Sequence, residues 1–330
     1  MAPILEVKDL RVRFDTEAGP VRVVRGVDFE LEKGKTLGIV GESGSGKSVT
    51  SLAIMRLLPR PSGVIEGGSV SLDGTDLTKL APSEMRRFRG NRVSMVFQEP
   101  MTALNPVQTI RRQLGESYVL HHPSMTPGDI ETASINLLEE VGIPAPEKRL
   151  DEYPHQLSGG MRQRVMIAIA LACRPDILIA DEPTTALDVT IQAQILSLIK
   201  RLQKEHGMAV IFITHDLGVI AEVCDEVIVM YAGRVVERRP VNDLFKKPRH
   251  PYTKGLLESI PRLDTEPKTM LPTIEGMVPD FSSLPEGCSF QNRCPHCVED
   301  CKAAMPELDR LDEIGFSRCI RTEELHEEIR

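Results

Sequence analysis

The feature that most constrains the fold of this chain is a glycine-rich segment placed between two apolar segments. It reads Gly41-Glu42-Ser43-Gly44-Ser45-Gly46-Lys47-Ser48, after the apolar run 36–40 and before the apolar-periodic stretch Val49–Leu58. A strand, a glycine-rich turn and a helix form a phosphate cradle, because backbone N–H groups and the helix N-terminus converge on phosphate oxygens. Lys47 is expected to reach the β- and γ-phosphates, and Ser48 to offer its hydroxyl to Mg²⁺. The alternative is an ordinary glycine-rich turn.

Composition narrows the class of protein. With 330 residues, 41% of them hydrophobic, the chain has enough material for two domains. The apolar run Val165–Cys173 is only about half as long as a bilayer crossing requires. The first residues lack a basic start followed by an apolar core, so we expect no secretory signal and a cytoplasmic protein. A net charge of −8 argues against nucleic acid as a partner.

The order of apolar runs predicts an α/β fold. Alternating residues over 4–14 and 21–31 predict an antiparallel β-layer, and 59–68 reads as a loop before a short strand at 69–72. Further strands are expected at 93–97, 177–180, 209–213 and 227–231, with helices at 130–141, 162–173 and 190–204. We place one domain over 1–240 with a helical subdomain over about 98–165, and a small, proline-rich appendage over 241–330.

Two adjacent carboxylates follow the apolar strand 177–180. Asp181 and Glu182 would lie at the C-terminal end of that strand, where ligands bind on open α/β sheets. Asp181 would help to hold Mg²⁺, and Glu182 would polarise the water that attacks the γ-phosphate. A solvated strand end is the alternative for this motif taken alone.

A second anion site is predicted where Ser158, Gly159 and Gly160 lead into the helix 162–173. One nucleotide does not need two such sites. With the phosphate loop and the carboxylate pair, this segment resembles the signature of the ATPase subunit of ATP-binding cassette (ABC) transporters. The resemblance implies a RecA-like parallel sheet, an antiparallel β-layer and a helical subdomain, with two ATP molecules sandwiched between two cassettes. Met161 stands where the family usually has glutamine.

The resemblance extends to the remaining family motifs, in order along the chain. It implies that Phe14 stacks on adenine, that Gln98 senses Mg²⁺ and the attacking water, and that His215 contacts the γ-phosphate. Asp188, in the string Ala186-Leu187-Asp188, belongs to the loop that crosses between cassettes. The resemblance thus assigns ATP to Phe14, residues 41–49 including Val49, Ser158, Gly159, Gly160 and Asp188, and Mg²⁺ to Ser48, Gln98 and Asp181.

Two longer strings, 98–106 and His250-Pro251-Tyr252-Thr253, are similar to the oligopeptide and dipeptide importer branch, which also takes up nickel. This implies an ATPase that powers peptide import from the cytoplasmic face of the inner membrane. The implied partners are a second cassette subunit, identical or related, two membrane permeases and an extracytoplasmic solute-binding protein. We expect the permeases to dock on the segment 98–150, a helical insertion that begins at Gln98. A soluble cassette ATPase that acts on nucleic acid is the rival.

Five of the seven cysteines fall in the last 43 residues. From spacing alone an iron–sulfur cluster, a zinc site and free thiols all stay open. The resemblance implies that Cys288, Cys294, Cys301 and Cys319 bind a [4Fe–4S] cluster and leaves Cys297 over; with zinc instead, His296 would be a ligand. The other two, Cys173 and Cys224, lie in apolar contexts and are expected in the core.

Overall fold

The structure is a computed structural model that describes residues 2–99, 103–185, 187–260, 272–313 and 315–328. The chain divides into two compact units. The first unit comprises Lys79–Phe212 with Glu32–Lys35 and the residues up to Ile4. The second unit comprises Leu5–Leu31, Thr36–Thr78 and the chain from Ile213 onward.

The strands of the first unit are buried along their length. They lie in the order β8-β7-β6, and β6 and β7 pair in parallel. Their bounds are β6 Val93–Val96, β7 Ile177–Asp181 and β8 Ala209–Ile213. Continuous apolar runs are typical of strands that are covered on both faces. The strands expected at 93–97, 177–180 and 209–213 are thereby confirmed to within one residue at each end.

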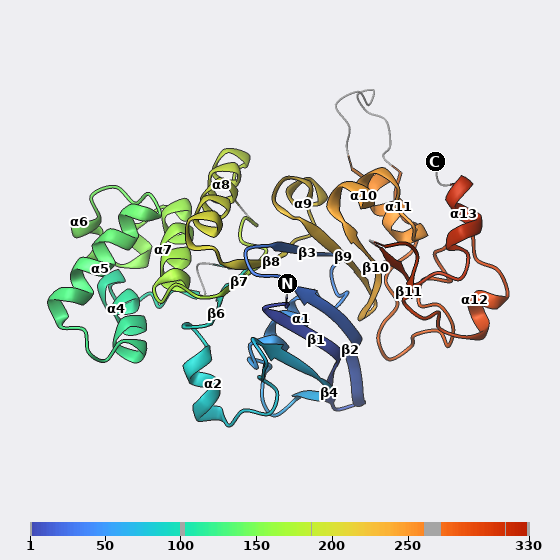
Figure 1. Cartoon of the computed structure of the whole chain (residues 1–330), viewed down its shortest axis with the longest axis horizontal. Coiled ribbons are helices and arrows are strands. Elements are labelled where there is room, and N and C mark those ends of the chain that lie inside the picture. The colour runs from blue at the N-terminus through green and yellow to red at the C-terminus, as the bar shows by residue number, and fades with distance from the viewer. Residues whose placement is uncertain (1, 100–102, 186, 261–271, 314, 329–330) are drawn as a thin grey trace. The chain divides into compact units, whose positions relative to one another are not determined.

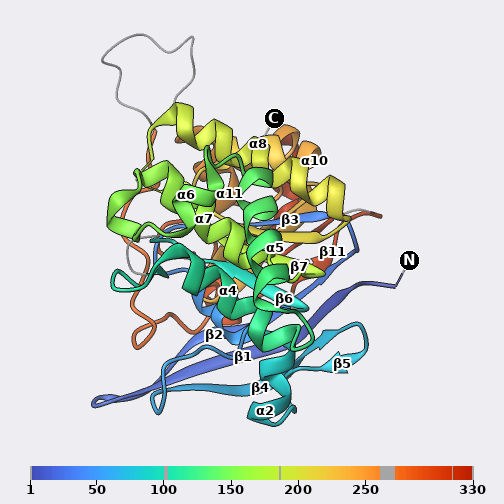
Figure 2. The ribbon, with the colours of Figure 1, turned by 90° about the vertical axis from the view of Figure 1, so that its left-hand side faces the viewer.

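Helices make up most of the first unit. The helices α4 to α7 lie between β6 and β7 in the sequence. They pack against one another as one group (Figures 1 and 2). Helix α5 begins at Pro127 after Thr126, whose hydroxyl and the Asp129 carboxylate form a capping box. The bounds are α2 Pro82–Phe88, α4 Ile110–His121, α5 Pro127–Glu140, α6 Pro146–Leu150, a 3₁₀ turn at Pro154–Gln156, α7 Gly159–Leu171 and α8 Val189–His206.

The second unit contains the expected antiparallel β-layer, with strand order β2-β1-β4-β5. Its strands are β1 Leu5–Thr16, β2 Gly19–Leu31, β4 Gly63–Leu72 and β5 Thr75–Asp76. The loop expected over 59–68 is wrong from residue 63 on. Gly63 pairs with Phe14 and Gly67 with Arg11, and a register shift between them accommodates one extra residue, Glu66. Pairing with β1 therefore overrides the low strand propensity of the glycines.

The other strands of the second unit lie in the order β11-β12-β10-β9-β3, with β3 parallel to β9 and the rest antiparallel. They are β3 Thr36–Val40, β9 Glu226–Tyr231, β10 Arg234–Pro240, β11 Asp309–Arg310 and β12 Phe316–Ser317. Because β12 pairs with β10, residues near the C-terminus extend this group of strands. The domain boundary near residue 240 and the subdomain bounds 98–165 stay predictions.

Within the described residues of the second unit, helices connect or follow these strands. They are α1 Lys47–Ile54, α9 Leu217–Val223, α10 Val241–Lys246, α11 Pro251–Glu258, α12 Asp300–Ala303 and α13 Thr322–Glu328. Helix α1 is shorter than the periodic stretch that suggested it. Across the part of the chain that the structure describes, no helix is long and apolar enough to cross a membrane.

Candidate functional site: the nucleotide motifs

The glycine-rich segment forms a tight loop between β3 and α1, and the backbone explains its glycines. Gly41 has φ +151°, and a Cβ atom there would lie 2.2 Å from the carbonyl oxygen of Met230. Gly46 has φ +98° and is the N-cap residue of α1. Side chains at these two positions would clash or strain the backbone. The loop is therefore built to bring the backbone close to a ligand at the N-terminus of a helix.

Lys47 is folded over the loop. Its side chain is almost fully buried, and Nζ donates to the carbonyl oxygens of Gly41 at 2.7 Å and Glu42 at 3.0 Å. Ser43 and Gly44, at the tip of the loop, are exposed. The ammonium group is thus held by two backbone acceptors of the loop itself. Phosphate oxygens could replace these acceptors with stronger, charge-assisted hydrogen bonds.

Two further candidate residues belong to the second unit. Phe14 is half-buried on β1, opposite Val21 on β2 and Gly63 on β4. His215 is exposed in the short connection between β8 and α9. Their roles toward adenine and the γ-phosphate stay predictions.

In the first unit the structure brings Gln98 and Glu182 together. Gln98 Nε2 donates to Glu182 Oε2 at 2.9 Å, and Thr185 Oγ1 donates to the same oxygen at 3.0 Å. Asp181 is the buried last residue of β7. Glu182 follows with φ +46°, a conformation that is uncommon for a residue with a side chain and recurs at functional sites. Two donors and a constrained backbone therefore fix the orientation of this carboxylate.

The predicted signature segment caps α7. Ser158 is the exposed N-cap residue, and its Oγ accepts the N–H of Met161 at 3.3 Å. Because Met161 contributes its backbone N–H, its departure from the family's glutamine leaves the cap intact. Gly159 and Gly160 form the first turn, and a Cβ on Gly160 would lie 3.0 Å from Cγ2 of Ile191.

The crossing-loop candidate Asp188 is also an N-cap residue. Its carboxylate accepts the N–H of Ile191 at 3.0 Å, which starts helix α8. A helix cap of this kind explains the residue locally, and its role between cassettes stays a prediction. Ala186 of the same string, and Pro100–Thr102 of the string 98–106, lie outside the described residues.

The cysteines of the C-terminal region are grouped around one cavity. Its lining includes Cys288, Cys294, Cys301 and Cys319, and among the described residues Cys297 is not part of it. The N–H of Cys288 donates to the carbonyl oxygen of Cys301 at 2.8 Å, which joins two of the segments that carry them. Burial raises the pKa of the Cys288 thiol to about 11 and that of Cys294 to about 12.

The donor chemistry of this cavity fits a soft metal centre, since four thiols from separate segments face one space. Within the described ranges, however, no three His, Cys, Asp or Glu side chains are arranged closely enough to hold a metal ion. None of the seven cysteines forms a disulfide bond with another described residue. Cys173 and Cys224 are buried, as expected for core residues.

Sequence reasoning missed two residues that contact the phosphate loop. Tyr252 accepts the backbone N–H of Glu42, and Arg293 forms an ion pair with the Glu42 carboxylate. Tyr252 lies in the string 250–253, which carried the family resemblance but suggested no contact. Arg293 precedes Cys294 and lies 251 residues from Glu42 in the sequence. No local pattern in the sequence marks such a long-range pair.

Comparison with known proteins identifies the chain's family. The family model for "ABC transporter" matches residues 24–185. A peptide import ATP-binding protein of Brucella ovis is 54% identical over 333 residues, covering 98% of both chains. The chain belongs to the ABC transporter family. The resemblance inferred from its motifs is thereby confirmed.

Other comparisons place this ABC ATP-binding protein more closely. Residues 236–301 match the "Oligopeptide/dipeptide transporter, C-terminal region" model. The chain is 53% identical to the dipeptide transport ATP-binding protein DppD of Bacillus subtilis, over 93% of this chain and 91% of that protein. A solved ATP-binding cassette, dimeric and bound to ADP and phosphate, has a TM-score of 0.63 and 27% identity over 72% of this chain and 98% of that one. The expected ABC ATPase fold is thereby confirmed.

Proposed function

We propose that this chain is the ATP-hydrolysing subunit that powers peptide import through an ABC transporter. The observation that carries the proposal is the match of residues 236–301 to the C-terminal region of oligopeptide and dipeptide transporters, which follows a cassette match in the same chain. Relatives named for peptide, dipeptide and oligopeptide transport support the same solute class. Import of nickel or another small solute of the same branch is the alternative.

In this proposal ATP binds to the phosphate loop of one chain. The signature segment of a second chain completes the ATP-binding site. Ser48, Asp181 and Gln98 would hold Mg²⁺, Glu182 would orient and polarise the attacking water, and His215 would contact the γ-phosphate. The adenine would stack on Phe14. Support comes from the constrained loop at Gly41, the buried lysine, and the Gln98–Glu182 hydrogen bond.

The partners follow from the same reading. A second cassette, identical or related, would supply Ser158, Gly159, Gly160 and Asp188. Two permease subunits would dock on the helical insertion, at the cytoplasmic face of the inner membrane, and an extracytoplasmic binding protein would deliver the solute. A solved cassette of similar fold described as dimeric supports the two-cassette arrangement.

Replacing Lys47 with alanine tests where the nucleotide binds. The variant loses a charge-assisted contact with the phosphates, so ATP affinity should fall by about 10- to 100-fold. Equilibrium titration of the purified chain with a fluorescent ATP analogue measures this. The control is Lys33→Ala, which replaces an exposed lysine in the turn before β3. It should bind the ATP analogue with normal affinity. Unchanged affinity in Lys47→Ala would mean that ATP binds elsewhere.

For the cysteine-rich region we propose a [4Fe–4S] cluster bound by Cys288, Cys294, Cys301 and Cys319, with zinc as the alternative. The support is that these four thiols line one cavity while Cys297 does not. Such a cluster would cross-link segments of the loop-rich appendage over 241–330, which has little hydrophobic core of its own.

Metal analysis of anaerobically purified protein tests this proposal. We expect about four irons and four acid-labile sulfides per chain, with visible absorbance, because four thiolates complete the ligand set of one cluster. Cys301→Ser should lower the iron content, whereas Cys297→Ser should leave it unchanged. Stoichiometric zinc, or no metal at all, would refute the iron–sulfur assignment.

The rival function, a soluble cassette ATPase that acts on nucleic acid, makes a different prediction. It requires salt-sensitive binding of DNA or RNA. We expect instead that the chain co-purifies with two multi-span membrane subunits. Nucleic-acid binding without such partners would favour the rival.

A further inference from the structure

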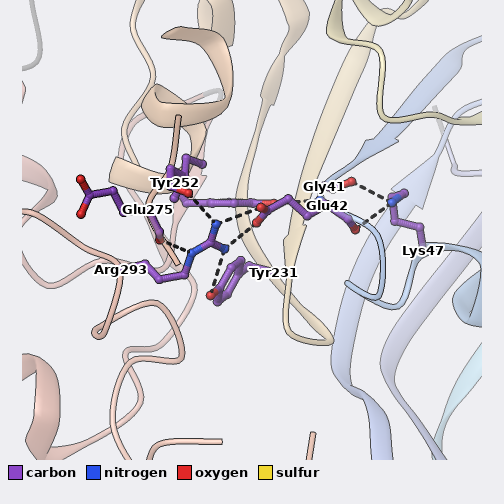
Figure 3. Close-up of polar contacts among 8 residues, drawn as sticks. Gly41, Glu42, Lys47, Tyr231, Tyr252, Glu275 and Arg293 are labelled. Atoms are coloured by element: carbon purple, nitrogen blue, oxygen red, sulfur yellow. Dashed lines mark hydrogen bonds and ion pairs between the residues drawn. The ribbon is translucent and has the colours of Figure 1, made fainter. Parts of the chain in front are cut away.

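The phosphate loop is held from outside by residues of the C-terminal region. Glu42, the second residue of the loop, forms a two-pronged ion pair with Arg293 (Figure 3). The Nη1–Oε2 and Nη2–Oε1 distances are 2.6 and 2.9 Å, and the Arg293 side chain is only 4% exposed. Paired hydrogen bonds between a guanidinium and a carboxylate fix the orientation of both groups.

Arg293 is itself fixed in place by backbone and aromatic groups. Its Nε donates to the carbonyl oxygen of Glu275 at 2.9 Å, and Nη2 donates to that of Ile274 at 3.2 Å. The guanidinium carbon lies 5.8 Å from the ring centre of Tyr231 and 6.0 Å from that of Phe290. Arg293 therefore links Glu42 to the C-terminal segments that contain Ile274–Glu275 and Phe290.

A second contact holds the backbone of the same residue. The N–H of Glu42 donates to the hydroxyl oxygen of Tyr252 at 2.9 Å. Tyr252 is fully buried, and its ring lies 4.7 Å from that of Tyr231 and 5.4 Å from that of Phe290. Both the side chain and the backbone of Glu42 are thus anchored to one aromatic cluster formed by Tyr231, Tyr252 and Phe290.

This anchoring acts directly on the group expected to bind phosphate. The carbonyl oxygen of Glu42 is one of the two acceptors of Lys47 Nζ. Ser43 and Gly44, which follow Glu42, are exposed and make the tip of the loop. Fixing Glu42 therefore fixes the start of the exposed tip, and a loop that is ordered before binding loses less conformational entropy when its ligand binds.

We propose that Arg293, together with Tyr252, is a positioning residue for the phosphate loop, so that the C-terminal region sets the affinity of this subunit for ATP. The inference rests on the proposed function, in which this loop binds ATP. Arg293 does not touch the nucleotide in this proposal. Arg293 acts through Glu42, and its removal should weaken the binding of ATP.

A double-mutant cycle on the ion pair tests the proposal in the purified full-length chain. Arg293→Met and Glu42→Gln should each lower ATP affinity by about tenfold, since either change frees the loop. The double variant should bind no more weakly than the weaker single variant, because both changes remove one interaction. Arg293→Lys, which keeps the charge but not the paired geometry, should recover part of the affinity.

Three controls separate positioning from stability and from the location of the site. Arg310→Met removes an arginine of the same region whose contacts are local carbonyls, and it should leave ATP affinity unchanged. Thermal melting shows whether each variant is folded at the titration temperature. Lys47→Ala shows whether the loop is the ATP site at all, so a failure of the proposed function is distinguished from a failure of this inference.

Normal ATP affinity in folded Arg293→Met and Glu42→Gln, beside a weakened Lys47→Ala, would overturn the inference and leave the proposed function standing. Additive losses in the double variant would also overturn it, since the two residues would then act independently. A loss of affinity in both single variants without further loss in the double variant is the result that the structure predicts.

Discussion

Replacing Glu182 with glutamine should leave ATP bound and lower steady-state hydrolysis by on the order of 10²-fold or more. The amide keeps the size of the side chain but cannot accept a proton from the attacking water. Gln98 and Thr185 both donate to Oε2 of Glu182, so one carboxylate oxygen is engaged and the group is oriented. The expected defect is therefore in the chemical step and not in nucleotide binding.

The measurement is phosphate release by the assembled transporter, with ATP affinity determined in parallel. The Glu32→Gln variant, with the same change at an exposed position in the turn before β3, should hydrolyse ATP at the normal rate. Near-normal turnover by assembled Glu182→Gln would exclude Glu182 as the general base. Loss of ATP binding would instead assign the residue to the binding site.

Ser158→Arg should abolish hydrolysis and leave ATP binding by the isolated chain intact. Ser158 is exposed at the start of α7, and in the proposed sandwich it faces the ATP of the other cassette. An arginine side chain there would fill the space that the partner's phosphates need. Because the segment serves the partner's site, the nucleotide bound by the altered chain itself should be unaffected.

Two assays on the same preparation test this separation. ATP titration of the monomer should match the unaltered protein, and hydrolysis by the assembled complex should fall to background. Ser83→Arg, which makes the same substitution at an exposed position of α2 outside the helical insertion, should retain hydrolysis. A monomer that no longer binds ATP would rule out the assignment of Ser158 to the partner's site.

Much of the fold could be predicted because its signals are local. The strands β7 and β8 are almost entirely apolar, and β6 is apolar except for Ser94, so each strand is marked by its own short stretch of sequence. The phosphate loop was predictable for the same reason, since its glycines are required by backbone geometry at Gly41 and Gly46. The first half of β4 was not, because its glycine-rich sequence forms a strand only through pairing with β1.

The sequence motifs of the candidate site could be predicted, but the residues that hold the phosphate loop in place could not. The same four cysteines that the family spacing groups together also line one cavity, and Cys297 is left over in both. By contrast, Arg293 and Tyr252 contact Glu42 across 251 and 210 residues of sequence. Such contacts depend on the packing of Tyr231, Tyr252 and Phe290, which leaves no pattern in any one segment.

The central claim, that ATP hydrolysis by this chain powers peptide import, is tested most directly in the assembled complex. The two permeases, the cassettes and the solute-binding protein would be reconstituted in vesicles and supplied with peptides or nickel. We predict that peptides stimulate ATP hydrolysis and accumulate in the compartment on the ATPase side, and that Glu182→Gln abolishes both. Stimulation by nickel alone, or uptake of peptide that does not depend on ATP hydrolysis, would contradict the account.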